Sequence, residues 1–423
     1  MAAVGAASRL DSAAGSLLAA GMNIDGTLAD GGNLSLAATQ LLGVNGQAIA
    51  AGDATLRGGG IDLAAGQAGA RNLSLTATRG DIDLGRATVS AAGTFSARAD
   101  AGAAQTLITD GGKLSAGQLD LAVANLSNAG GEIVQTGAGD TAIALASGGT
   151  AGRLDNTGGR IAANSANLTI KAGTLTNTGG PGGGPPGGIE HAGAGTLAIT
   201  AATLEGAGGL IQSNGTLDLR AAAATLDGGR TVARQVAIDA ATLGNRGGQI
   251  LQTGDGAAAA VKASILLDNT GGTVASNGGA TLAVGDLLNR GGTIQAAGAA
   301  SLAISATGAV DNGVLRDAGG NPALDADGGL RKGVIQAGGA ARLAAASLDN
   351  RQGQVTAGGP LTAAVAQALD NRGGTLASGG DLAAAAGSLD NTGGAVQAQG
   401  SAALAVSGDF SNGALGRAYA GRL

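Results

Sequence analysis

The sequence predicts an all-β chain that folds as a parallel β-helix, a solenoid of about twenty coils with ~20–22 residues in each. Three observations predict this fold: a short phrase recurs at a near-constant spacing, apolar and polar residues alternate inside each repeat, and large side chains are almost absent. Gly supplies 83 of the 423 residues, whereas Phe, Tyr and Trp together supply 1%. A narrow interior filled by Leu, Ile, Val and Ala explains this composition, because a large ring would crowd it.

The recurring phrase has the form Leu-Asp-Asn-Thr/Arg-Gly-Gly and marks one repeat. It begins at Leu154, Leu267, Leu369 and Leu389, and looser copies begin at Leu126, Leu175, Leu204, Leu226, Leu243, Leu287, Val310, Leu348 and Phe410. The last four starts, at positions 348, 369, 389 and 410, are 21, 20 and 21 residues apart. Repetition at a fixed period of this length is typical of a solenoid, in which each coil contacts only its neighbours.

An aliphatic residue follows most of these phrases, seven positions after the start. These residues are Ile133, Ile161, Ile211, Ile250, Val274, Ile294, Val355, Leu376 and Val396. In two repeats the match comes later, at Ile189 and at Ile335, which predicts loops inserted at 181–187 and at about 314–332. Without these insertions the two intervals shorten from 29 and 38 residues to 22 and 20, so we expect the coil to continue after each loop.

Each repeat is expected to contain three short strands. In the repeat from 389 to 408, a turn at 391–394 is followed by alternating residues at 395–398, a second turn, and a further alternating stretch at 403–406. A period of two that is bounded by Gly, Asn and Ser predicts strands rather than helices. Stacked coils of this kind supply one another's backbone hydrogen bonds.

The third position of the phrase is almost always Asn. Asn stands there at Asn128, Asn156, Asn177, Asn245, Asn269, Asn289, Asn312, Asn350, Asn371, Asn391 and Asn412, and Gly stands there at Gly206 and Gly228. Both residue types tolerate a positive φ, so we expect this position to form a left-handed corner between strands. Asn side chains stacked on successive coils would also be able to form an amide ladder.

The repeat divides the chain into four stretches. Residues 1–30 are a poorly defined N-terminal segment, 31–125 are degenerate coils that keep the alternation, 126–413 carry the clear repeat with its two insertions, and 414–423 are expected to be a frayed end. The first and last coils of a solenoid expose unpaired backbone groups unless they are capped. We therefore expect the chain to tend to associate end to end with other copies.

Composition excludes several classes of function. The chain has no Cys, and its single His, His191, is expected in a loop beside the 181–187 insertion, so neither a metal site nor a cofactor is expected. A net charge of −6 argues against a nucleic-acid partner, whose binding surface would be basic. No run of about 18 large apolar residues predicts a membrane span, and residues 1–10 lack the basic and apolar regions of a secretory signal.

The phrases at 369–382 and 389–394 resemble the haemagglutinin repeats of the filamentous haemagglutinin family, which are large bacterial exoproteins of two-partner secretion systems. The resemblance covers residues 126–415, and it covers 30–125 through strands of the kind at 80–84. It implies a right-handed β-helix, export through an outer-membrane transporter, and a place outside the cell or on its surface. It also implies adhesion to host cells or other bacteria through surface receptors or glycans. The family's signal peptide and N-terminal secretion domain have no counterpart here, so we expect a fragment of such an exoprotein.

Two alternatives stay open beside adhesion. The runner-up is the passive stalk of a contact-dependent growth-inhibition toxin, which a downstream toxin domain would reveal. Parallel β-helices also include enzymes that cleave polysaccharides, but these need several carboxylates and bases converging on one groove. The Asp residues of this chain recur in phase with the repeat and do not cluster, so no enzyme is expected.

Two sequence features are candidate sites. Arg79-Gly80-Asp81 is a tripeptide that integrins recognise on exposed turns, but Asp81 also directly precedes the strand expected at 82–84 and would simply open it. The phrase also carries a column of acidic residues, Asp155, Asp227, Asp268, Asp311, Asp349, Asp370 and Asp390. The spacing of calcium-binding β-rolls is absent, so we expect this column to pair with Arg351 and Arg372 on neighbouring coils.

Overall fold

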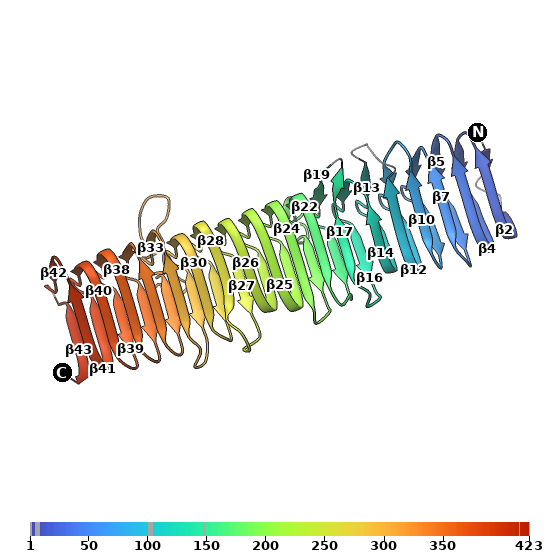
Figure 1. The fold of residues 1–423 in the computed structure, drawn as a ribbon. Coiled ribbons are helices and arrows are strands. Elements are labelled where there is room, and N and C mark those ends of the chain that lie inside the picture. The colour runs from blue at the N-terminus through green and yellow to red at the C-terminus, as the bar shows by residue number, and fades with distance from the viewer. Residues whose placement is uncertain (1, 5–8, 100–104, 148, 414, 423) are drawn as a thin grey trace. The chain divides into compact units, whose positions relative to one another are not determined.

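The computed structural model describes residues 2–4, 9–99, 105–147, 149–413 and 415–422. The chain divides into two compact units, residues 1–218 (unit 1) and 219–423 (unit 2). Within each unit short parallel strands stack coil upon coil (Figure 1), and the described strands make about 19 turns in all. The predicted all-β solenoid is therefore confirmed.

Unit 1 contains the strands β1 to β24 and residues 210–218 of β25, whose remaining residues belong to unit 2. They are β1 (Ala2–Val4), β2 (Arg9–Ala19), β3 (Met22–Ile24), β4 (Thr27–Ala38), β5 (Leu41–Val44), β6 (Gln47–Ala50), β7 (Ala54–Gly58), β8 (Gly60–Asp62), β9 (Gln67–Ala70), β10 (Leu73–Ala77), β11 (Ile82–Asp83), β12 (Thr88–Ala99), β13 (Thr106–Ile108), β14 (Lys113–Ala122), β15 (Asn125–Ser127), β16 (Glu132–Gln135), β17 (Thr141–Ala144), β18 (Ala146–Ser147), β19 (Thr150–Ala151), β20 (Arg153–Asp155), β21 (Arg160–Ala163), β22 (Leu168–Thr176), β23 (Gly188–His191), β24 (Thr196–Glu205) and β25 (Leu210–Thr225). One short 3-10 turn, η1 (Pro181–Gly183), lies in the Pro/Gly insertion.

Unit 2 continues the same pattern. Its strands are β26 (Arg230–Gly244), β27 (Gln249–Gln252), β28 (Ala259–Asp268), β29 (Thr273–Ser276), β30 (Ala280–Leu288), β31 (Thr293–Ala296), β32 (Leu302–Ala306), β33 (Ala309–Asp311), β34 (Val334–Ala337), β35 (Ala341–Ala345), β36 (Ser347–Asp349), β37 (Gln354–Ala357), β38 (Leu361–Asp370), β39 (Thr375–Ser378), β40 (Leu382–Asp390), β41 (Ala395–Val406), β42 (Phe410–Ser411) and β43 (Arg417–Arg422).

The coils of each unit have three faces. Face I follows the Asn position and is formed by strands such as β16, β21 and β23, or β27, β29 and β31. Face II is formed by the strand that follows face I along the chain. Face III is formed by the last strand of the coil, which carries the Leu-Asp pair directly before the next Asn. A long strand such as β28 belongs to both faces II and III, and its pairing with β30 shifts register between Ala263 and Leu266, where the chain bends.

The interior is built from columns of aliphatic side chains in exact coil-to-coil register. Ile161 pairs with Ile133 on one neighbouring strand and with Ile189 on the other, and all three are almost fully buried. Ile335 likewise pairs with Ile294 and Val355. The spacing argument for the inserted loops thus identified the correct partners on either side of both insertions. Burying one aliphatic side chain per face and coil contributes about 1.5–3 kcal/mol each to folding.

The second insertion consists of two successive small hairpins, and it projects from the coils beside β33 (Figure 1). Isolated antiparallel bridges join Val314 to Lys332, Arg316 to Pro322, and Leu324 to Leu330. Val314 is buried at its base, whereas Leu324 is 59% exposed. The insertion is therefore anchored by its first residue and otherwise lies outside the stacked coils.

The predicted left-handed Asn corner is wrong. Among the described residues, the non-glycine residues with a positive φ are Ala65, Arg86, Gln352 and Leu415, so no Asn of the repeat is left-handed. The left-handed residue lies two positions after the Asn, for example Gly373 with φ 62° after Asn371. Asn is selected at the third position because its side chain points inward, where every ladder residue described below except the exposed Asn412 is 0–1% exposed.

Gly at the sixth position of the phrase has a separate cause. A Cβ on Gly374 would lie 2.1 Å from the backbone oxygen of Asn350 on the preceding coil. That distance is far below van der Waals contact, so the two coils approach each other too closely for any side chain. The second Gly of the phrase therefore serves the stacking of coils, while the first serves the turn.

Both chain ends are more regular than the sequence predicts. Within 1–30, which was expected to be poorly defined, β2 pairs with β4 in parallel register, and residues 1 and 5–8 lie outside the described part. In place of a frayed end over 414–423, β43 pairs with β41, and residues 414 and 423 lie outside the described part. The coils continue there although the Leu-Asp-Asn residues of the phrase are missing, because the strands pair through their backbones.

Candidate functional site

Two runs of stacked asparagine side chains line the inside of the corner between faces III and I. In unit 1, the Nδ2 of Asn128 donates to Oδ1 of Asn156, and the Nδ2 of Asn156 donates to Oδ1 of Asn177, each over 2.7 Å. In unit 2, one unbroken ladder of the same bonds, 2.6–2.8 Å long, joins Asn245, Asn269, Asn289, Asn312, Asn350, Asn371, Asn391 and Asn412.

Each amide in the ladder also serves the backbone. Asn371 Nδ2, besides its bond to Asn391, donates to the backbone oxygen of Ala395 over 3.2 Å. Both N–H groups of the amide are thereby used inside an apolar coil, where an unpaired polar group would cost about 1–3 kcal/mol. The ladder is consequently a structural element that fixes the corner.

The prediction that Gly228 occupies the Asn position of its coil is wrong. The backbone N–H of Gly229 donates to the oxygen of Leu226, as that of Gly248 donates to the oxygen of Asn245, so Leu226 occupies the Asn position in its coil. Leu226 is 3% exposed and offers no hydrogen bond. As a result Oδ1 of Asn245, the first residue of the unit 2 ladder, is buried without a partner.

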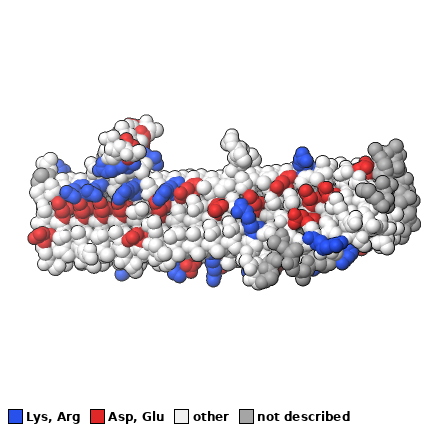
Figure 2. Space-filling view, turned by 90° about the horizontal axis from the view of Figure 1, so that it is seen from above, with Lys and Arg blue, Asp and Glu red and all other residues white. Residues whose placement is uncertain are grey.

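The acidic column of face III pairs with arginines, as predicted for Arg351 and Arg372. Arg351 contacts Asp349 of its own coil and, at 3.7 Å, Asp370 of the next coil; Arg372 repeats this with Asp370 and Asp390. Arg246 and Arg290 form the corresponding pairs with Asp268 and Asp311. Figure 2 shows the result as a row of basic side chains beside a row of acidic ones. Because the charges neutralise each other and most are exposed to solvent, these pairs contribute little to the stability of the fold.

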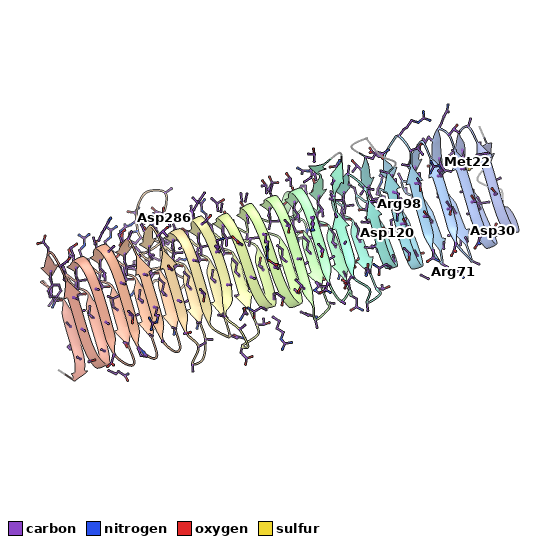
Figure 3. All side chains as sticks on the ribbon, in the orientation of Figure 1. Met22, Asp30, Arg71, Arg98, Asp120 and Asp286 are labelled. Atoms are coloured by element: carbon purple, nitrogen blue, oxygen red, sulfur yellow. The ribbon has the colours of Figure 1, made fainter. Side chains whose placement is uncertain are left out.

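Ion pairs between neighbouring coils also occur elsewhere in unit 1. Arg98 of β12 and Asp120 of β14 point toward each other in Figure 3 and form an ion pair, and Arg71 pairs with Asp53. Hydrogen bonds from Arg71 and Asn72 hold the pKa of the Asp53 carboxyl below its usual range. These contacts link adjacent coils in the same manner as the paired rows of unit 2.

The Arg79-Gly80-Asp81 tripeptide lies on the turn between β10 and β11, with Arg79 and Asp81 exposed. Arg79 Nη2 donates to the backbone oxygen of Thr39 over 2.6 Å, and Oδ1 of Asp81 accepts from the backbone N–H of Thr106 over 2.8 Å. Both charged groups are thus engaged with residues of other coils, and the tripeptide lies along the solenoid wall.

A hollow of about 410 Å³ lies on face I of unit 1, above β16, β21, β23 and β25. Its floor contains small apolar side chains, Val134, Ala162 and Ala192, and its polar lining comprises Thr136, Arg160, Asn164, Glu190, Gln212 and Asn214. We call it the Arg160 hollow. Its volume falls in the range of small-molecule sites, and it joins an apolar floor to a few convergent polar groups, as such sites do.

A three-residue ion network borders the Arg160 hollow. Arg160 donates to both oxygens of Glu190, from Nε over 2.9 Å and from Nη2 over 2.8 Å, and Nη1 donates to Glu132 over 3.0 Å. The bonds to Glu190 are the main cause of the raised pKa of Arg160. Two carboxylates from the coils on either side therefore hold one guanidinium in a fixed orientation, as bidentate pairing does.

His191 lies directly behind this hollow, and its predicted place in a loop is wrong. It is in strand β23 and 1% exposed. Its Nε2 lies 2.9 Å from the backbone oxygen of Ser165, and its Nδ1 lies 3.1 Å from Oγ of Ser213. Because a carbonyl oxygen only accepts, Nε2 carries a proton. The imidazole therefore ties together the turns that carry Asn164 and Asn214 on their outer side.

The described part of the chain holds neither a metal-ligand cluster nor a long apolar helix. There, no group of three or more His, Cys, Asp or Glu side chains is arranged to hold a metal ion. Nor does any helix in those residues have the length and apolarity needed to cross a membrane.

Comparison with known proteins identifies the repeat. The haemagglutinin repeat family model matches residues 192–266, 261–314, 317–373 and 356–414, together just over half of the chain. The chain belongs to the haemagglutinin-repeat family. The match begins at 192, whereas the resemblance was expected from 126, and it spans the hairpin insertion with a break of only two residues.

Two curated relatives match part of the chain. Toxin CdiA of Yersinia pestis is 44% identical over 127 residues, which are 30% of this chain and 4% of that protein. The tRNA nuclease CdiA-2 of Burkholderia pseudomallei strain 1026b is 40% identical over 101 residues, 24% of this chain and 3% of that protein. The chain thus corresponds to a very small part of either relative. No solved structure matches it significantly.

Sequence reasoning missed the Arg160 hollow of this haemagglutinin-repeat chain. Its residues stand at outward positions, which the repeat does not constrain, so no periodic signal marks them. One clue was present: Arg160 and Glu190 stand at outward positions of two aligned face I segments, 30 residues apart across the first insertion. Aligning outward positions once the inserted loop was removed would have brought the two charges together.

Proposed function

We propose that the chain is an adhesive β-helical segment of a secreted or surface-exposed bacterial exoprotein, without a catalytic role. By its family it would be exported through the outer-membrane transporter of a two-partner secretion system. Adhesion would use the outward residues of the coils and reach receptors or glycans on host cells or other bacteria. The inward residues, by contrast, are occupied with stacking one coil on the next.

The observation that carries this proposal is the contrast between the two sides of each strand. Inward positions repeat from coil to coil, as in the Asn ladders and the column of Ile133, Ile161 and Ile189. Outward positions vary, and in unit 1 they form a hollow that combines charged, amide and apolar groups. A scaffold that keeps its interior constant and varies its exterior suits recognition more than chemistry.

A second candidate function is favoured by the relatives. Both carry toxin or nuclease names, and the chain corresponds to 3–4% of their length. A solenoid segment of such a protein would serve as a passive stalk that holds a toxin region at a distance. Because coils pair through their backbones, a stalk of this kind needs no outward recognition site.

Binding of the purified chain to epithelial and bacterial cells separates the two functions. We expect the unaltered chain to bind the cells saturably. A variant with an altered outer surface should lose this binding although it still folds. Binding assays with heparin as a competitor and with Asp81→Ala as a variant would show which surface carries it. If the folded chain shows no saturable binding to either cell type, adhesion is excluded and the stalk function is supported.

A further inference from the structure

The Arg160 hollow offers both hydrogen-bond acceptors and donors. Asn164 and Asn214 each donate one amide N–H to a backbone oxygen, that of Thr136 over 3.2 Å and that of Ala192 over 3.0 Å, which leaves the Oδ1 atom and the second N–H of each amide to a ligand. Glu190 adds carboxylate oxygens as acceptors. Further donors come from the exposed amide of Gln212 and from the N–H groups of Arg160 beyond those already used. Groups that both donate and accept would satisfy this mixture, and hydroxyls do so.

Charge argues for an uncharged ligand. Arg160 is bound on both sides by Glu132 and Glu190, so the network carries one net negative charge. An anionic ligand would meet two carboxylates and a guanidinium that is already paired. A cationic ligand would be repelled by the guanidinium of Arg160, which is held between the same two carboxylates that the ligand would need.

The floor of the hollow suits the carbon face of a small ring. Val134, Ala162 and Ala192 provide methyl groups but no polar atoms beyond the backbone, and Ala162 is only 8% exposed. No aromatic side chain lines the hollow, so a ring would contact methyl groups rather than stack on a ring face. Binding of a single ring is therefore expected to be weak, in the millimolar range.

We propose that the Arg160 hollow binds a neutral hexose unit of a cell-surface glycan, an inference that rests on the proposed adhesive function. The hydroxyls bond to Asn164, Gln212 and Asn214, while the carbon face lies on the alanine floor. Arg160 orients the ring through its remaining N–H groups. Weak single-site binding becomes effective attachment when many copies of the exoprotein meet many glycan chains.

The rigidity of the site supports this assignment. The His191 bridge links the turns of Ser165 and Ser213 from inside the coil, immediately behind Asn164 and Asn214. His191 has Ala163 as its register partner on β21, so the preceding coil has no side-chain bridge at this position. Polar groups held in place before the ligand arrives lose little entropy on binding.

Titration of the full chain with methyl galactoside, methyl glucoside and methyl mannoside, followed by saturation-transfer NMR, tests the proposal. We expect at least one of the three to bind with a millimolar Kd, and Gln212→Ala to weaken that binding at least fivefold. Gln336→Ala is the matched control, because Gln336 is the third residue of a face I strand in unit 2, as Gln212 is in unit 1, and is likewise exposed. The control is expected to bind like the unaltered chain.

The outcomes separate this proposal from the proposed function. Absence of binding to all three glycosides, or equal weakening by Gln212→Ala and Gln336→Ala, would overturn the hexose site. Stronger binding of an acidic sugar such as glucuronic acid would overturn the choice of a neutral ligand. If the chain attaches to cells but does not bind a hexose, the adhesive function is retained and only the hexose site is overturned. If it binds a hexose but does not attach to cells, the site is retained and the adhesive function is overturned. Far-UV circular dichroism of each variant confirms its fold.

Discussion

Thr109 Oγ donates to Oδ1 of Asn128 over 2.8 Å and so completes the first amide of the unit 1 ladder. The first amide of the unit 2 ladder has no such donor, because Leu226 stands in the Asn position of the coil before Asn245. The two ladders therefore begin differently: one is fully bonded, and the other begins with a buried, unpaired oxygen. That difference makes the energetic role of the ladder measurable.

Asn371→Leu is expected to lower the free energy of unfolding by about 2–4 kcal/mol. It leaves one N–H of Asn350 Nδ2 without its acceptor and Oδ1 of Asn391 without its donor, while Asn350 Nδ2 keeps its bond to the backbone oxygen of Thr375. Leu itself fits the position, since Leu63 and Leu84 occupy it in unit 1 and are fully buried. Urea denaturation of the purified variant measures the loss.

Asn245→Leu is the matched control for that variant. It leaves Asn269 Oδ1 without its donor, but it also removes the oxygen of Asn245 that was already unpaired. The number of unpaired groups stays the same, so we expect a change within about 1 kcal/mol of the unaltered chain. Equal losses for the two variants would show that the side chain matters for its shape and not for the ladder.

Gln352→Gly is expected to stabilise the chain by about 0.5–1 kcal/mol, because Gln352 has φ 58° and a side chain is strained there. The adjacent coil has Gly373 at the same position with φ 62°, and Gly373→Ala is expected to destabilise by a similar amount. A Cβ on Gly373 would meet its nearest neighbour at an ordinary 3.5 Å, so backbone strain is the only cost. Thermal melts that shift in the same direction for both variants would contradict this explanation.

The fold could be predicted from sequence because the coil interior imposes its period on the chain. Ile189 and Ile335 were identified as core residues across insertions of seven and about eighteen residues, since an aliphatic column tolerates no other register. The prediction of a left-handed Asn corner was wrong for a related reason. Asn and Gly both tolerate a positive φ, but the Asn residues are selected for their amide groups. The alignment at 226–228 was wrong because Leu226-Asp227 matches the first two residues of the phrase although it lies two positions out of register.

The candidate site could not be predicted in the same way. Arg160, Glu190 and Gln212 lie on outward positions, where neighbouring coils carry unrelated residues and no packing constraint preserves a pattern. His191 was assigned to a loop because it stands close to the Pro/Gly insertion in sequence. The alternation of its strand, with Ile189 inward and Glu190 outward, places it inward, but that alternation is visible only once the start of β23 is known.

Acid is expected to destabilise unit 2 through Asp268. Burial raises the pKa of this carboxyl, but hydrogen bonds from Thr270 and Arg246 outweigh burial, so its pKa lies below the usual value. A group with a lowered folded pKa stabilises fully above its unfolded pKa of about 3.9, and that stabilisation is lost as the pH falls through the folded pKa. Thermal midpoints at pH 7, 5, 4 and 3 should therefore fall less steeply for Asp268→Asn than for the unaltered chain. Parallel curves would show that Asp268 does not contribute.

Asp81→Asn distinguishes a structural from an adhesive role of the Arg79-Gly80-Asp81 tripeptide. Asn keeps an oxygen for the backbone N–H of Thr106 but removes the carboxylate that integrin recognition requires. We expect unchanged stability and unchanged attachment to integrin-bearing cells, whereas Asp81→Ala should lose about 1 kcal/mol of stability with attachment unchanged. Loss of attachment in both variants would assign the tripeptide to adhesion.

Deletion of residues 181–187 is expected to leave the unit 1 coils intact. The deletion joins Gly180 to Gly188 and restores an Asn-Thr-Gly-Gly phrase followed directly by β23, as Asn156 is followed by β21. The removed segment contains no strand, and Ile161 keeps Ile189 as its partner. Shortening the loop lowers the entropy cost of closing it, so the free energy of unfolding should stay equal or rise by less than about 1 kcal/mol.

A second deletion that removes 188 and 189 as well is the control, because it takes Ile189 out of the aliphatic column and should cost about 2–5 kcal/mol. If the first deletion were as damaging as the second, the Pro/Gly segment would be part of the coil and not a loop added to it.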